Sequence, residues 1–268
     1  MKIARAVAVT LCLVQLGVLC GACSASHKAA PRNPGPPAST GSAAGTLVVL
    51  ASTQLKPAFE QLDTQFAAAN PGVAVTATYQ GSQALATAVQ AGAQGDLFAT
   101  DADPMAALAA AGAVVTPTVQ TFARNELEIV VPAGNPKAIQ RLADLADPGT
   151  TLVLADPSLP AGRDAVTALA LAGVRVTPKA SVSTVALLMT AVLSGNADAG
   201  IAFQSDIVAA GSGVTGVALP AGSAVEETYR IGVLRNASNP SAASAFVQFV
   251  HSDRGRSALT AAGFVPAS

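Results

Sequence analysis

The chain has 268 residues, of which 51% are hydrophobic and 12% are charged, with a formal net charge of −1. Four of the 15 basic residues precede position 46 and all 16 acidic residues follow it, which leaves the remainder at −5. This balance argues against nucleic acid as a partner and requires that any bound anion be held by local geometry. All three cysteines lie in the first 23 residues, so disulfides and cysteine metal ligands are excluded from the rest.

The first 23 residues have the pattern of an export signal. Lys2 and Arg5 form a positive start, and residues 6–19 are an apolar stretch too short to span a bilayer comfortably. Small residues then precede Cys23, as in a lipoprotein cleavage box. We therefore predict a lipoprotein signal peptide over residues 1–23, ending at a lipidated Cys23. A plain secretory signal cut elsewhere is the alternative.

Residues 24–45 are rich in Pro, Ser, Gly and Ala and show no apolar periodicity. A segment of this composition cannot bury a core, so it reads as a semi-flexible tether. A diacylglyceryl group plus an N-acyl chain on the cysteine before it would hold the protein firmly. We expect an extracytoplasmic protein that is lipid-anchored to the outer face of the cell membrane.

From residue 46 onward, the hydrophobic pattern alternates between strand and helix. We expect strands at 47–50, 73–79, 95–99, 127–131, 151–155, 199–203, 214–219 and 229–234. We expect helices at 55–69, 83–91, 104–111, 139–145, 164–172, 185–193 and 242–250. Repeated units of this kind favour α/β architecture, with helices on both faces of a parallel sheet.

The number of strands suits two small lobes better than one sheet. We predict a lobe I made of residues 46–125 plus 221–268, and a lobe II made of residues 126–220. Each lobe should hold a mixed, mostly parallel sheet flanked by helices. Open α/β sheets place ligands outside the carboxyl ends of their strands, so the cleft between the lobes is the expected binding position.

Two short stretches, 81–86 and 155–162, predict what this cleft binds. Each reads as a strand end, a tight turn of small or hydroxyl residues, and the start of an apolar helix. The first backbone N–H groups of a helix are unpaired, and the macrodipole adds roughly half a positive charge there. Such a turn binds anions without any cation. The sequence therefore predicts a receptor for a small oxyanion.

The ordered motifs from Leu47 to Phe264 resemble those of one family. They are Gly81-Ser82 with Leu85-Ala86, Gly95 to Ala99, Asp156-Pro157 with Pro160-Ala161-Gly162, Ala197 to Ile201 with Ser205-Asp206, and Gly263-Phe264. The region resembles the molybdate-binding proteins of ABC import systems, within the type II periplasmic-binding-protein fold. The resemblance implies a monomeric protein without a cofactor. It would capture molybdate, and also tungstate, between its lobes and deliver the anion to a membrane permease and its ATPase.

The resemblance also implies a set of ligand-binding residues with neutral donors. Ser82 matches a hydroxyl donor, while Ala161 and Val185 match backbone N–H donors. Two positions depart from the family, because Gln54 stands where a serine ligand belongs and Phe203 where a tyrosine is frequent. We include both in the expected site, but a lost hydrogen bond to a charged ligand costs roughly 1.5–3 kcal/mol.

Several alternatives stay open at this point. Thr53 or Ser52 could supply the donor of the first turn in place of Gln54. A receptor of the same fold for sulfate, phosphate or an organic anion is the second interpretation. An arginine commonly holds the carboxylate of an organic ligand, and Arg163 follows the Pro-Ala-Gly turn directly. Ser82 could also be an ordinary helix N-cap.

An enzyme is the main competing class, and the sequence disfavours it. The only histidines are His27 and His251, and neither a Gly-x-Ser-x-Gly elbow nor clustered metal ligands are present. Asp96, Asp156 and Asp206 lie near strand ends. We interpret them as turn and capping carboxylates, because a carboxylate beside a bound dianion would repel it.

Overall fold

A computed structural model describes residues 44–267, so the predicted signal peptide, Cys23 and nearly all of the tether lie outside the described residues. The strands are β1 (Gly45–Ser52), β2 (Val73–Gln80), β3 (Leu97–Asp101), β4 (Gln120–Pro132), β5 (Val153–Ala155), β6 (Ala180–Val182), β7 (Gly200–Phe203), β8 (Val214–Ala218), β9 (Glu226–Val233) and β10 (Val265–Pro266). The helices are α1 (Lys56–Ala69), α2 (Ser82–Gln90), α3 (Ala102–Ala110), α4 (Pro160–Leu171), α5 (Val185–Leu193), α6 (Gln204–Ala210), α7 (Pro240–Val250) and α8 (Asp253–Ala261). Within this range, no helix is both long and apolar enough to cross a membrane.

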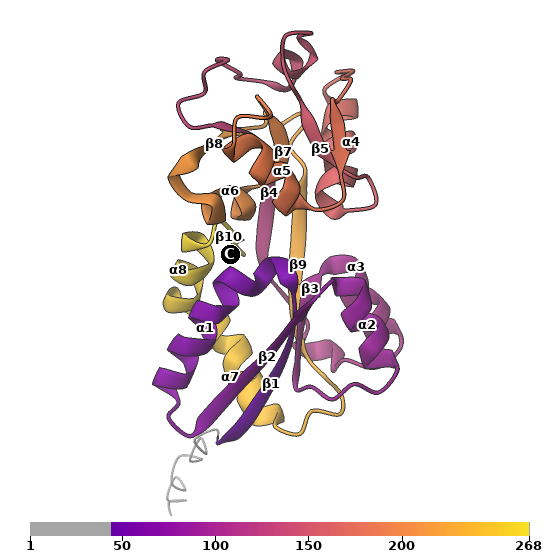
Figure 1. Ribbon diagram of the computed structural model, residues 1–268. Coiled ribbons are helices and arrows are strands. Elements are labelled where there is room, and N and C mark those ends of the chain that lie inside the picture. Colours follow the sequence, from indigo (N-terminus) through magenta and orange to yellow (C-terminus); the bar gives the residue numbers. More distant parts are fainter. Residues whose placement is uncertain (1–43, 268) are drawn as a thin grey trace, which may run out of the picture. The chain divides into compact units, whose positions relative to one another are not determined.

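Strand β4 belongs to two lobes. Its first half pairs with β9 and β10, and its second half pairs with β7 and β8. The partners change between Glu126 and Leu127. The chain returns between β8 and β9, and Figure 1 shows β4 and β9 at the junction of the two lobes. We use lobe I for residues 44–126 plus 226–267, and lobe II for residues 127–225.

The structure has a mixed sheet with flanking helices, as predicted. In lobe I, β1 is parallel to β2 and β3, whereas β9 is antiparallel to β3 and β4. In lobe II, β7 and β8 are antiparallel to β4, and only the small β5–β6 pair is parallel. Antiparallel pairing is more common than we expected, because β4 leaves lobe I and β9 must return beside it in the opposite direction.

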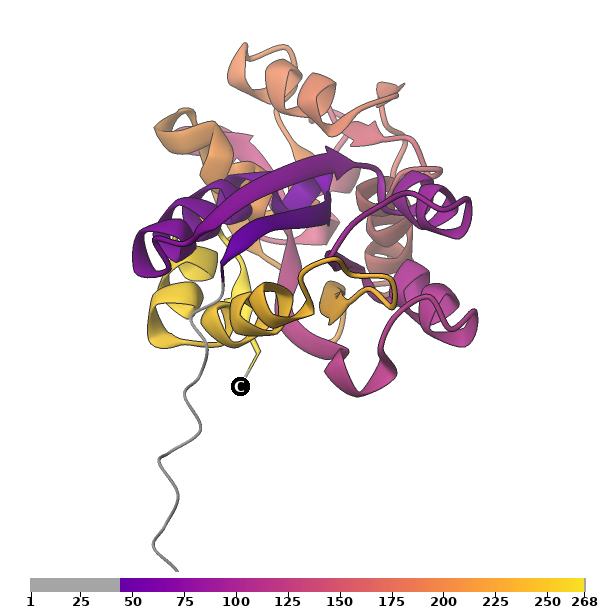
Figure 2. The same ribbon diagram turned by 90° about the horizontal axis from the view of Figure 1, so that it is seen from below.

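Two layers of helices cover the sheet of lobe I. Figure 2 shows α1, α7 and α8 on one side and α2 and α3 on the other. Alternation along β1 explains both layers, since Leu47 and Val49 pack with the first group while Leu50 packs with the second. Lobe II has a core of its own, around the second half of β4 with helices α4 and α5. The lobes therefore hold separate cores that are joined by continuous strands.

One helix was predicted wrongly. Residues 139–145 form a loop that ends in a short 3-10 turn, η3 (Leu142–Ala146). Asn135 and Ala138, just before this segment, have positive φ values, so the chain enters the segment from a turn and not from a helical conformation. The carboxylate of Asp144 then accepts the backbone N–H groups of Gln140 and Arg141 at 2.9 and 3.2 Å, which closes the turn without a helix.

Candidate functional site

A cleft of about 500 Å³ lies at the junction of the two lobes. Lobe I contributes the turn after β1, the start of α2, the end of β3, the first turn of α3 and one residue of β9. Lobe II contributes the starts of α4 and α5. The lining residues are Ser52, Thr53, Gln54, Gly81, Ser82, Gln83, Ala84, Asp101, Asp103, Pro104, Ser158, Leu159, Pro160, Ala161, Arg163, Ser183, Thr184, Val185 and Glu227.

Helix α2 begins at the cleft without a side-chain cap. Gly81 occupies the N-cap position and Ser82 is the first helical residue. The hydroxyl of Ser82 makes no hydrogen bond within residues 44–267, and its side chain is half-buried. Ser82 is therefore not the N-cap of this helix, and its hydroxyl is free to donate into the cleft.

Helix α4 begins with Pro160, so its first N–H is already absent, and Ala161 is its second residue. A Cβ on Gly162 would collide with the backbone carbonyl of Asp156, so glycine allows the helix to start directly against the turn after β5. This close approach brings the backbone of Ala161 to the wall of the cleft.

Helix α5 begins at Val185 after the N-cap residue Thr184. The Thr184 hydroxyl accepts the N–H of Leu187 at 3.2 Å, which satisfies the third residue of the helix. The N–H of Val185, at the first position, has no partner within the helix and lies at the cleft. Its contribution, like that of Ala161, depends on the backbone and not on the side chain.

The turn after β1 holds a contact that the sequence did not reveal. The Tyr229 hydroxyl donates to Oε1 of Gln54 at 2.5 Å. Tyr229 is completely buried in lobe I, whereas Gln54 is half-buried at the cleft and its neighbour Thr53 is exposed. The two residues are 175 positions apart, and nothing in the local pattern of either one predicts the pairing.

Carboxylates form an acidic rim on the cleft, which we define as Asp101, Asp103 and Glu227. We did not predict these residues. Burial raises the pKa of Glu227 to about 7, and the charges of Asp101 and Asp164 add to that effect. Among residues 44–267, no group of three or more His, Cys, Asp and Glu is placed to hold a metal ion.

The guanidinium of Arg163 is engaged by two carboxylates. Its Nη2 atom lies 3.4 Å from Oε2 of Glu227, and its Nε atom lies 3.2 Å from Oδ1 of Asp164. The side chain is 57% exposed. Because two carboxylates already pair with this guanidinium, Arg163 attracts an organic carboxylate less strongly than its position in the sequence suggested.

The structure brings five of the six predicted ligand residues to one cleft: Thr53, Gln54, Ser82, Ala161 and Val185. Phe203 is the exception, because it is completely buried in the core of lobe II and does not line the cleft. Ligand binding by the five remains a prediction.

Two of the three aspartates singled out in the sequence, Asp96 and Asp156, accept hydrogen bonds from backbone N–H groups. Asp96 accepts the N–H groups of Val48 and Asn239, each at 2.8 Å. Asp156 accepts the N–H of Ser158 at 2.9 Å, which closes the turn before α4. For these two residues, the interpretation as turn and capping carboxylates is confirmed. Asp206 lies in the first turn of α6, and its Oδ2 atom is buried with no hydrogen-bond partner in the described range.

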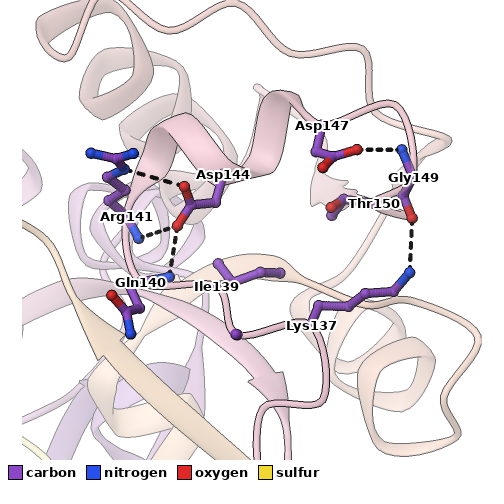
Figure 3. A pocket seen from close by; sticks show the side chains of 9 residues that line it. Lys137, Ile139, Gln140, Arg141, Asp144, Asp147, Gly149 and Thr150 are labelled. Atoms are coloured by element: carbon purple, nitrogen blue, oxygen red, sulfur yellow. Dashed lines mark hydrogen bonds and ion pairs between the residues drawn. The ribbon is translucent and has the colours of Figure 1, made fainter.

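A larger hollow of about 620 Å³ lies within lobe II, along the loop that was predicted as a helix (Figure 3). Its polar groups satisfy one another. Lys137 donates to the carbonyl of Gly149 at 3.1 Å, Asp147 accepts the N–H of Gly149 at 2.7 Å, and Asp144 holds Arg141. The hollow therefore has little left to offer a ligand.

The two lobes and the cleft between them define a solute receptor, and the comparisons agree. The family model for bacterial extracellular solute-binding proteins matches residues 47–265, and the chain belongs to that family. Members of this family are extracellular proteins that bind solutes. The molybdate-binding protein ModA of Mycobacterium tuberculosis (strain H37Rv) is 38% identical over 230 residues, which are 85% of this chain and 87% of that protein.

Solved structures share the fold. The periplasmic molybdate-binding protein of Azotobacter vinelandii superposes with a TM-score of 0.69 at 20% identity, over 83% of this chain and 100% of that one. The sulfate-binding protein SubI of Mycobacterium tuberculosis H37Rv superposes with a TM-score of 0.67 at 21% identity, over 83% and 87%. At these identities, the likeness concerns the fold alone.

Proposed function

We propose that the protein captures molybdate in the cleft and delivers it to the membrane permease of an ABC importer. The observation that carries this proposal is the convergence of uncharged donors from both lobes. Ser82 and the turn at Gln54 belong to lobe I, while the backbone groups of Ala161 and Val185 belong to lobe II. The name of the mycobacterial relative supplies the identity of the anion.

Binding draws on both lobes at once. A dianion that leaves water loses strong hydration, so its oxygens must all find donors in the cleft. Donors that come from both lobes satisfy them best when the lobes are close, and the ligand therefore favours the closed arrangement. The chain crosses between the lobes twice, within β4 and again on entering β9. The lobes can bend toward each other at these two crossings.

Tungstate has the same charge as molybdate and nearly the same size, so we propose that it binds as well. Sulfate is smaller, and its rejection depends on the fit of the cavity. A receptor for an organic anion is less favoured, because Arg163 is already matched by Asp164 and Glu227.

The partners follow from this role. The permease and ATPase of the importer receive the ligand, and a lipidated Cys23 with the tether of residues 24–45 keeps the receptor near them. We propose that the receptor acts as a monomer and without a cofactor.

Calorimetric titration tests the proposal. The purified protein is titrated with molybdate, tungstate, sulfate and phosphate in turn. We expect tight binding of the first two and little response to the others. Binding of sulfate or phosphate in preference to molybdate, or no response to any of the four, would contradict the proposal.

A further inference from the structure

Gln54 is the residue at which the cleft meets a buried chain of polar side chains. Its Oε1 atom accepts from Tyr229, and within residues 44–267 no hydrogen bond of its Nε2 atom is found. The Nε2 end of a carboxamide carries two N–H donors, whereas the Oε1 end only accepts. Which end faces the cleft therefore decides whether Gln54 attracts an anion or repels it.

A backbone amide fixes the orientation of the Asn125 side chain, which is the buried polar group next to Tyr229 in this network. The N–H of Ser205, in α6 of lobe II, can only donate, and it lies 3.3 Å from Oδ1 of Asn125 on β4. The Nδ2 atom of Asn125 donates to the hydroxyl of the same residue, Ser205, at 2.8 Å. Asn125 is completely buried, so its amide group is held in this orientation.

The phenol of Tyr229 is the group that contacts Gln54 at the cleft. Burial raises the pKa of Tyr229 well above its usual value, nearby Glu227 and Asp101 add to the rise, and a hydrogen bond with Asn125 opposes it. The phenol therefore stays protonated, with a single hydrogen. That hydrogen is donated to Oε1 of Gln54 at 2.5 Å, which leaves the Nε2 end of the carboxamide away from the phenol.

We propose that Tyr229 is a positioning residue, which holds the Gln54 carboxamide with its Nε2 atom toward the cleft and so makes Gln54 a donor to the bound oxyanion. This inference rests on the proposed function, since it concerns the same site. It gives Gln54 the role of first-turn donor that the sequence left open among Ser52, Thr53 and Gln54.

A double-mutant cycle tests the inference on the purified full-length chain, with molybdate as the probe in calorimetry. We expect Tyr229→Phe to weaken binding about 10-fold, the scale of one hydrogen bond to a charged group. Phenylalanine keeps the ring and its edge contact with Phe264. The matched control is Tyr79→Phe, which removes the hydroxyl that donates to Asp63 at 3.1 Å, outside the cleft lining, and should leave the affinity unchanged.

The same substitution in a Gln54→Ala background distinguishes a positioning role of Tyr229 from a general loss of structure. If Tyr229 acts through Gln54, Tyr229→Phe causes no further loss in a Gln54→Ala background. Equal affinity of Tyr229→Phe and wild type, or losses that simply add, would overturn the inference while the proposed function stands. A wild-type protein that binds no molybdate would overturn both.

A spectroscopic measurement on the wild type covers the case in which Tyr229→Phe fails to fold. The side-chain amide resonances of Gln54 are identified by their absence from the Gln54→Ala spectrum. We expect them to shift when molybdate is added, because both Nε2 protons face the ligand. Unshifted Gln54 resonances in a protein saturated with molybdate would overturn the inference.

Discussion

At the residue scale, the site depends as much on backbone groups as on side chains. Ala161 and Val185 bring no polar side chain to the cleft, so a substitution that preserves their N–H groups leaves the donors in place. Sequence alone located the turn before α4, which follows a predicted strand, whereas Val185 was assigned from the family resemblance and the strand before it, β6, was not predicted. The sequence did not reveal Glu227 at the cleft or Tyr229 beneath Gln54, because both are placed there by the long-range pairing of β9 with β3 and β4.

Val185→Pro should weaken molybdate binding about 10-fold or more while the fold is retained. Proline is favoured at the first position of a helix, and Thr184 before it is already extended with ψ 148°. The change therefore removes one N–H donor with little strain, and calorimetry measures the loss. Val185→Ala is the control, because it trims the side chain but keeps the donor. Equal affinities for the two variants would show that this N–H does not contact the ligand.

At the element scale, the segments with clear apolar periodicity were predicted correctly, including the helix at 185–193. Helix α4 begins four residues before its predicted start, because Pro160 serves as its first residue. Helix α8 escaped prediction because its sequence is mainly polar and only a few of its residues are buried. Periodicity detects a helix with a wide apolar face and misses one that touches the core along a narrow stripe.

Gly162→Ala should lower both stability and affinity. The new Cβ would collide with the carbonyl of Asp156 and push the start of α4 away from the turn after β5. Overpacking of this kind costs about 1–3 kcal/mol of stability. Thermal unfolding and calorimetry measure the two effects on the same variant.

Gly255→Ala provides the matched control for Gly162→Ala. A Cβ on Gly255 would meet the backbone carbonyls of Phe249 and Val250, but helix α8 does not line the cleft. We expect a similar loss of stability with unchanged affinity. If Gly162→Ala lost stability alone, the position of α4 would be unimportant for binding.

At the scale of the whole molecule, stability should fall as the pH rises from about 4 to about 7. Burial raises the pKa of Asp63 and Asp206 from 3.8 to about 6, and that of Glu227 from 4.5 to about 7. The folded state keeps protons that the unfolded state has already lost. The favourable contribution is complete below the unfolded values and disappears as the pH passes the folded ones.

Thermal unfolding at pH 5 and pH 8 measures this dependence, and we expect the lower Tm at pH 8. Asp206→Asn should flatten the profile, because the Oδ2 atom of Asp206 is buried without a hydrogen-bond partner in the described range. A Tm that rose between pH 5 and pH 8 in the wild type would contradict the raised pKa values.

The acidic rim has a kinetic consequence. A dianion approaching Asp101, Asp103 and Glu227 meets like charge on a domain that is itself negative. Added salt screens this repulsion, with a Debye length of about 10 Å at 0.1 M, and so should accelerate capture. An anion receptor built on basic residues would be slowed by the same salt. The rate of molybdate uptake across a salt series therefore distinguishes a site that attracts its ligand from afar from one that recognises it only on contact.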